Sequence, residues 1–106
     1  MNLKGSLPLL ILHILNNGAR HGYQLAQEIK QKSAGVLNFK EGTLYPTLHT
    51  LEQQGNVETY TEVINGRTRR CYRLTNQGRD TLEAQIHEWR QFTLAVNLVL
   101  KDDSAS

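Results

Sequence analysis

Apolar residues recur at helical spacing in three segments of the first half of the chain. The first segment, residues 7–15, is apolar at nearly every position, which predicts a helix that is buried on all sides. Ser6 is the expected N-cap of this helix, and Pro8 then falls in its first turn. A second helix is predicted for residues 21–32, because its apolar residues lie one turn apart. A short strand is expected at residues 36–39.

A third helix is predicted for residues 42–54, with Gly55 after its end. Leu44, Leu48 and Leu51 fall at positions i, i+4 and i+7, so they form one buried stripe. The opposite face carries hydroxyl, imidazole and amide groups, which can bond base edges and phosphates, although a neutral solvated face would have the same composition. The candidate nucleic-acid contacts on this helix are Thr43, Tyr45, Pro46, His49, Thr50 and Gln53.

A β-hairpin is predicted around Asn65-Gly66, the preferred residue pair for a two-residue type I′ turn. This turn places Ile64 opposite Arg67 and fixes the register of both strands. The face expected to pack on a core carries Val57, Thr59, Tyr72 and Leu74. The other face places unlike charges opposite one another, in the pairs Glu58 with Arg73 and Glu62 with Arg69.

The last predicted helix begins at Thr75, whose hydroxyl can cap it, and runs for about 25 residues. Its apolar residues are spaced alternately by four and three over about two and a half heptads, which is the spacing of a coiled-coil seam. Three short helices and a hairpin cannot cover the far end of so long a helix, so a second copy of the chain is the expected partner. The predicted dimer interface comprises Leu10, Ile14, Leu82, Ile86, Trp89, Phe92, Val96 and Leu100.

Three helices followed by a hairpin form the pattern of a winged helix-turn-helix, a mainly α fold with a small β-hairpin. The predicted domains are a winged-helix DNA-binding domain over residues 1–75, and a C-terminal dimerisation helix with a short tail over residues 76–106. In this fold the third helix enters the major groove, and the wing lies along an adjacent groove. Arginines at and behind the wing tip suit phosphate or minor-groove contact, unless the tip only serves solubility. These arginines are Arg67, Arg69 and Arg70.

The net charge of the chain is +2, but its distribution is uneven. Residues 1–79 carry ten Lys and Arg against five Asp and Glu, whereas residues 80–106 carry two against five. Only the first part is therefore expected to meet a polyanion, unless the asymmetry is ordinary surface charge. Tyr23, near the start of the second helix, is a further candidate for a phosphate contact, with core packing as the alternative role.

Other classes of function have little support in the sequence. The four histidines lack metal-ligand spacing, and the single cysteine, Cys71, has no histidine or second cysteine beside it. No phosphate-binding loop or dinucleotide fingerprint occurs, so we expect neither an enzyme nor a cofactor. The N-terminus lacks the features of a signal peptide, and the longest apolar run is too short to span a bilayer, so a cytoplasmic location is expected.

Five short motifs occur in order along residues 5–90. They are His21-Gly22-Tyr23, Gly42-Thr43-Leu44-Tyr45-Pro46, Leu51-Glu52-Gln53-Gln54-Gly55, Arg70-Cys71-Tyr72-Arg73-Leu74-Thr75 and Gly78-Arg79. Together they resemble the PadR family of transcriptional regulators. The resemblance implies a winged helix, a C-terminal dimerisation helix and repression of nearby genes. The single C-terminal helix resembles the short subtype, and Cys71 departs from the aromatic residue often found at its position.

The resemblance also implies a ligand site of a particular kind. In some short members, tryptophans of the last helix face each other across the dimer and sandwich flat aromatic molecules. Trp89 matches that position, and with Ile86 and Phe92 it forms the candidate ligand site. The alternative is that Trp89 only fills the dimer interface.

The sequence therefore predicts a sequence-specific DNA-binding transcriptional regulator that acts as a homodimer on a pseudo-palindromic operator. Repression relieved by a planar aromatic ligand is the expected mode of action. The alternative function is a winged-helix adaptor whose basic wing binds an acidic protein instead of double-stranded DNA.

Overall fold

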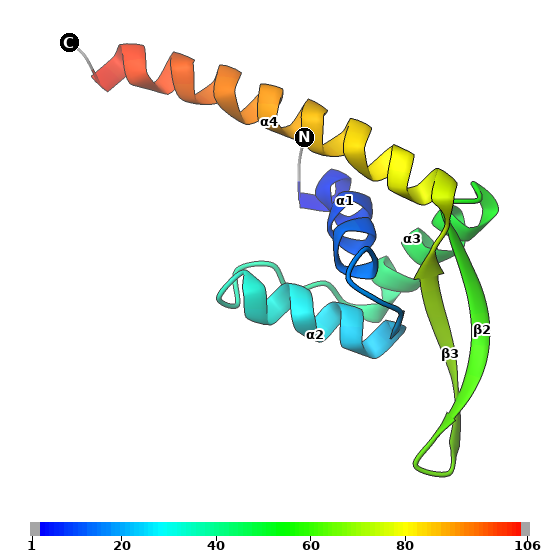
Figure 1. Ribbon diagram of the computed structural model, residues 1–106. Coiled ribbons are helices and arrows are strands. Elements are labelled where there is room, and N and C mark those ends of the chain that lie inside the picture. Colours follow the sequence, from blue (N-terminus) through cyan, green and yellow to red (C-terminus); the bar gives the residue numbers. More distant parts are fainter. Residues whose placement is uncertain (1–2, 105–106) are drawn as a thin grey trace.

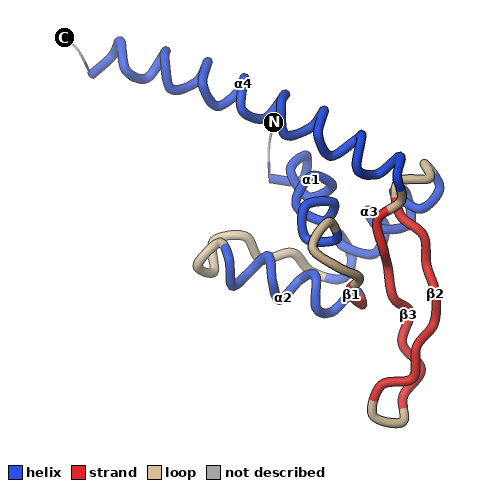
Figure 2. Tube along the Cα trace, in the orientation of Figure 1, coloured by secondary structure: helices blue, strands red, loops and turns tan. Residues whose placement is uncertain are grey.

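The computed structural model describes residues 3–104, with side chains described for residues 5–101. Four helices and three strands follow one another in this part of the chain (Figures 1 and 2). The helices are α1 (Leu3–Leu15), α2 (Gly22–Lys32), α3 (Glu41–Gln53) and α4 (Asn76–Ser104). The strands are β1 (Arg20–His21), β2 (Val57–Ile64) and β3 (Arg67–Leu74). The predicted mainly helical fold with a small hairpin is confirmed.

Helix α1 begins earlier than predicted. It includes Leu3, so Ser6 lies inside the helix and the prediction that Ser6 caps it is wrong. Pro8 therefore falls in the second turn, where its missing N–H removes one backbone hydrogen bond. Burial of the apolar side chains that follow offsets this loss, and Ile11 and Leu12 have no exposed surface. The helix is buried on nearly all sides, as its composition predicts.

The sheet is antiparallel with the strand order β1-β3-β2. Strands β2 and β3 pair in the predicted register throughout. Asn65 and Gly66 have φ angles of 51° and 77°, so both residues adopt the left-handed conformation that a type I′ turn requires. The hairpin projects from the body as a long ribbon, shown in red in Figure 2.

The strand predicted at residues 36–39 is wrong. Residues Arg20 and His21 form the third strand instead, and they pair with Tyr72 and Cys71 of β3. Strand β3 then has a neighbour on both sides. Phe39 still contributes a buried side chain to the core, but it does so from irregular chain.

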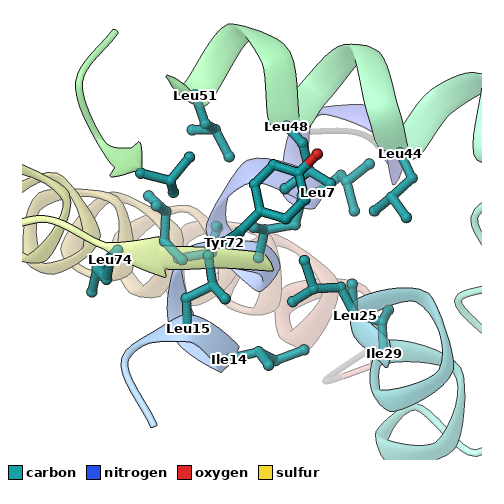
Figure 3. Packing of buried hydrophobic residues seen from close by; sticks show 14 of the residues in the cluster. Leu7, Ile14, Leu15, Leu25, Ile29, Leu44, Leu48, Leu51, Tyr72 and Leu74 are labelled. Atoms are coloured by element: carbon teal, nitrogen blue, oxygen red, sulfur yellow. The ribbon is translucent and has the colours of Figure 1, made fainter. Parts of the chain in front are cut away.

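The core lies where α1, α2, α3 and β3 meet, with the ring of Tyr72 among leucine side chains (Figure 3). The predicted stripe of α3 is buried, since Leu44, Leu48 and Leu51 are at most 2% exposed. Helix α3 is thus held by one face, and the face on its other side remains available to solvent. This packing decides which α3 side chains can meet a ligand.

Helix α4 has 29 residues and is capped by Thr75, whose hydroxyl accepts a hydrogen bond from the Gly78 N–H at 3.0 Å. Leu82 is buried, and Ile86 and Trp89 pack against the core. The second half of the helix extends past the body of the molecule (Figure 1), and the longest dimension of the chain is 61 Å. Residues 105–106 of the predicted tail lie outside the described residues. None of the described helices is apolar over a stretch long enough to cross a membrane.

Candidate nucleic-acid interface

The outer face of α3 presents polar side chains to solvent. Its amphipathic pattern fixes this orientation, because the leucine stripe faces the core. Thr43 is half-buried. The other predicted contact residues on the helix are exposed, namely Tyr45, Pro46, His49, Thr50 and Gln53. The helix thus offers aromatic, imidazole, hydroxyl and amide groups without a carboxylate among them.

Tyr45 lies across the start of α2, and a glycine makes this possible. A Cβ atom added to Gly22 would lie 2.7 Å from the Tyr45 ring, closer than any real side chain approaches. The backbone of α2 can therefore reach the ring only where no side chain intervenes. His21, directly before this glycine, is the N-cap of α2, and its N–H donates to Gln24 Oε1 at 3.1 Å. The motif His21-Gly22-Tyr23 thus joins α2 to α3.

A hollow of about 330 Å³ lies where α2, α3 and β3 meet. Tyr23 and Tyr45 line it from the helices, and Arg69 and Arg70 line it from the wing. Both tyrosines are well exposed, at 57% for Tyr23 and 41% for Tyr45. The structure therefore brings these four predicted contact residues together around one concave surface.

Two further hollows adjoin the first, and Tyr23 lines all three. One, of about 480 Å³, lies between α2 and the wing tip and includes Arg67. The other, of about 600 Å³, lies between α2 and the start of α3. The Tyr23 hydroxyl accepts a hydrogen bond from Gln27 Nε2, within the same helix, at 3.0 Å. Its exposure disfavours the alternative role in core packing.

Within the described residues, the three predicted contact arginines of the wing, Arg67, Arg69 and Arg70, form no ion pair with an acidic residue. Arg67 and Arg70 are exposed, and Arg69 is half-buried. Glu62 lies opposite Arg69 in the register, as predicted, but within the described residues no ion pair joins them. The Glu62 carboxylate instead accepts from the Cys71 thiol at 3.6 Å. By contrast, Glu58 and Arg73 form the predicted pair at 2.6 Å.

The charge of the wing affects the titration of its neighbours. Burial and then the charge of Arg69 lower the pKa of His21 below its ordinary value of 6.5, so this imidazole is neutral at pH 7. Burial raises the pKa of Tyr72, while the charge of Arg70 acts in the opposite direction. Over the described residues, no group of three His, Cys, Asp or Glu side chains could hold a metal ion.

Some residues at this surface were missed. Five predicted residues of α3 line none of the three hollows, namely Thr43, Pro46, His49, Thr50 and Gln53. Lys30 and Lys40 line the hollow between α2 and α3. Lys30 could have been found, because it follows Tyr23 by seven residues and so lies on the same face of α2. Thr50 borders a different hollow, of about 240 Å³, together with Pro8 of α1 and Gln85 of α4.

The residues predicted for a dimer interface fall into two sets. Ile14 and Leu82 are already buried within this chain, and Leu10, Ile86 and Trp89 are partly buried against its core. Phe92, Val96 and Leu100 are exposed on the projecting part of α4. The rings of Trp89 and Phe92 form a tilted pair with centroids 6.1 Å apart, at the boundary between the two sets.

Known proteins resemble this chain along most of its length. The family model for the "Transcriptional regulator PadR-like family" matches residues 11–84. An uncharacterized protein X of Lysinibacillus sphaericus is 30% identical over 93% of this chain and 92% of its own length. The transcriptional regulator Rv3488 of Mycobacterium tuberculosis is 45% identical over 67% of this chain and 66% of its own length.

The likeness extends to solved structures. A PadR family transcription regulator from Clostridium difficile R20291 superposes with a TM-score of 0.80 and 32% identity, covering 91% of this chain and 99% of that protein. The matched region includes the end of α1, the whole of α2 and α3, the wing and the first turns of α4. The chain is therefore a member of the PadR-like family of transcriptional regulators.

Proposed function

We infer that this transcriptional regulator is a sequence-specific DNA-binding repressor that works as a homodimer. The observation that supports this most directly is the hollow in which Tyr23, Tyr45 and the wing arginines meet, because it joins α3 and the wing into one surface. In a winged helix these two elements occupy neighbouring grooves of one duplex. Residues 1–75 would then form the DNA-binding domain, and residues 76–106 would serve dimerisation.

The two elements have different roles in this proposal. Imidazole and amide groups in the second half of α3, on His49 and Gln53, can read base edges in the major groove. Arginines of the wing bind phosphates or the minor groove and supply affinity that is independent of sequence. The residues proposed to contact DNA are Thr43, Tyr45, Pro46, His49, Thr50, Gln53, Arg67, Arg69, Arg70 and Tyr23.

The projecting half of α4 supports the dimer. Several of its large apolar side chains are more than half exposed, among them Leu94, Leu98 and Leu100. A soluble monomer rarely leaves so many neighbouring apolar side chains in water. Two copies joined along α4 present two α3 helices, which matches a pseudo-palindromic operator, and a dimer bound at a promoter would exclude polymerase.

We propose that an aromatic effector relieves repression and that Trp89, Ile86 and Phe92 bind it. Phe92 is exposed, and its ring forms a tilted pair with that of Trp89, which is only partly buried against the core. Titration of planar cationic drugs and flavins should quench the fluorescence of Trp89. If none of them changes the fluorescence, Trp89 has only a packing role.

Gel-shift measurements test the DNA-binding proposal. The duplex is the DNA directly upstream of the gene that encodes this chain. The purified chain should retard this duplex at a concentration at which an unrelated duplex of equal length and composition stays free. Equal retardation of both duplexes would leave only nonspecific binding. If neither duplex is retarded, even at low ionic strength, the adaptor that binds an acidic protein becomes the better account.

A further inference from the structure

Asn56 is a buried polar residue, only 4% exposed, at the junction between α3 and β2. Its side-chain oxygen accepts two hydrogen bonds from α4, from Thr81 Oγ1 at 2.9 Å and from Gln77 Nε2 at 3.2 Å. Its side-chain nitrogen donates to Gln54 Oε1 at 3.3 Å, directly after α3. One amide group therefore connects the end of α3 to the first two turns of α4.

The backbone reinforces this connection. The Asn56 N–H donates to the Leu51 carbonyl of α3 at 3.0 Å, and the Asn56 carbonyl accepts from the Thr75 N–H at 3.1 Å. A Cβ atom added to Gly78 would overlap the same Asn56 carbonyl. The start of α4 thus touches the backbone of the short loop that joins α3 to β2, where the Asn56 amide is buried. We name this group of residues, Asn56, Thr75, Gln77, Gly78 and Thr81, the Asn56 joint.

Farther along α4, Leu82, Ile86 and Trp89 make apolar contacts with the core. Apolar packing is not directional, so by itself it would hold α4 on the body while allowing small rotations. Hydrogen bonds have preferred distances and angles, and a buried amide that loses them is left unsatisfied. The joint is therefore the part of the contact that best fixes the direction of α4.

The direction of α4 matters because the helix is a lever. From Gly78 to Val96, where the exposed apolar half lies, the rise along the helix is about 27 Å. A tilt of about 10° at the joint would shift Val96 by about 5 Å relative to α3, which exceeds the rise of about 3.4 Å for one base pair. In a dimer joined through the far half of α4, such a tilt would move the two α3 helices apart or together.

We propose that the Asn56 joint sets the spacing between the two half-sites that the dimer accepts, with Asn56, Gln77 and Thr81 as positioning residues that do not touch DNA. This inference rests on the proposed function, because it requires a dimer that binds two half-sites. Loosening the joint should leave each α3 able to read its own half-site. It should remove the preference for one distance between the half-sites.

The test is a selection from duplexes with a random central segment of about 40 base pairs, long enough for half-sites one or more helical turns apart. Wild type is compared with the double variant Thr81→Val and Gln77→Ala, which removes both donors to the Asn56 oxygen. Thr59→Val is the matched control, since the Thr59 hydroxyl bonds Glu52 between β2 and α3 at 3.1 Å and does not reach α4. All three proteins are first compared for folding and dimer mass.

Wild type and Thr59→Val should enrich one half-site spacing, favoured by about tenfold over a spacing one base pair longer or shorter. The double variant should enrich the same half-site with a preference for spacing reduced to about threefold or less. If the folded, dimeric double variant retains the wild-type preference, the inference is wrong. Should the double variant unfold, Gln77→Ala alone carries the test, because Gln77 is exposed.

Failure of the proposed function has a different outcome. In that case wild type enriches no duplex at all. Enrichment of single half-sites by wild type, without a preferred spacing, would instead leave DNA binding intact and contradict only the role of the Asn56 joint.

Discussion

Two glycines in this chain are needed because other parts of the molecule lie where their side chains would project. The Tyr45 ring occupies that space at Gly22, and the Asn56 carbonyl occupies it at Gly78. A displaced ring can rotate away at low cost, whereas the Asn56 carbonyl cannot move without shifting the backbone between α3 and β2. Neither neighbour could be inferred from the sequence, because each approach joins segments that lie far apart along the chain.

Substitution of alanine for Gly78 should therefore destabilise the fold. We expect the free energy of unfolding to fall by about 1–3 kcal/mol, the usual cost of inserting atoms into a filled space. Gly42→Ala is the control, since nothing lies within 4 Å of a Cβ atom at Gly42, and alanine favours the helix there. Urea unfolding of both variants measures the difference, and similar stabilities would contradict the observed overlap.

Cys71 should be unreactive in the folded protein. Burial, and then the hydrogen bond to Glu62, raise the pKa of its thiol above 9.0, so the nucleophilic thiolate is scarce at pH 8. A thiol reagent should modify the native chain about 100-fold more slowly than the chain unfolded in urea. Equal rates in the two states would show that the thiol is accessible on the wing.

Local chemistry predicts the elements best where a turn or a stripe specifies them. The Asn65-Gly66 turn gives the complete register of the hairpin, and the leucine stripe gives the orientation of α3. Strand β1 was not predicted, because two residues are too short for any period and its pairing depends on the distant β3. The start of α1 was placed too late, because a serine before an apolar run can also lie inside a helix.

The wing is expected to contribute affinity without sequence information. Arg67→Ala should weaken binding to all duplexes and reduce the slope of log K against log salt by about 1, because a phosphate contact releases a counterion. Arg90→Ala removes an exposed arginine of α4 and should leave the slope unchanged. Binding isotherms at four or more salt concentrations measure both slopes, and a wild-type slope for Arg67→Ala would exclude the wing tip from the interface.

The projecting half of α4 is expected to hold the dimer together. Glutamate at both Val96 and Leu100 should weaken dimerisation by at least about tenfold, because charges would enter an apolar interface. The folded monomer should survive, since both side chains are exposed within one chain. Sedimentation equilibrium gives the dissociation constant. Val63→Glu, at an exposed apolar position of β2, should leave it unchanged, and an equal effect there would indicate a different interface.

At the scale of the whole molecule, the order of elements and the family follow from motifs that lie close together in sequence. The assembly of the interface does not, because Tyr23, Tyr45 and Arg70 come from three elements that meet only in the folded chain. The Asn56 joint is harder still to foresee, since an asparagine after Gly55 is typical of an exposed turn, whereas the start of α4 covers this one.

The central claim is that two copies of the chain, joined through α4, present two α3 helices and two wings to one duplex. Sedimentation velocity of the purified protein, with and without the duplex from upstream of its own gene at low ionic strength, tests this most directly. The account predicts a free dimer and a saturated complex that contains two chains per duplex. A monomer that leaves the duplex free, or that binds it as a single chain, would contradict the account.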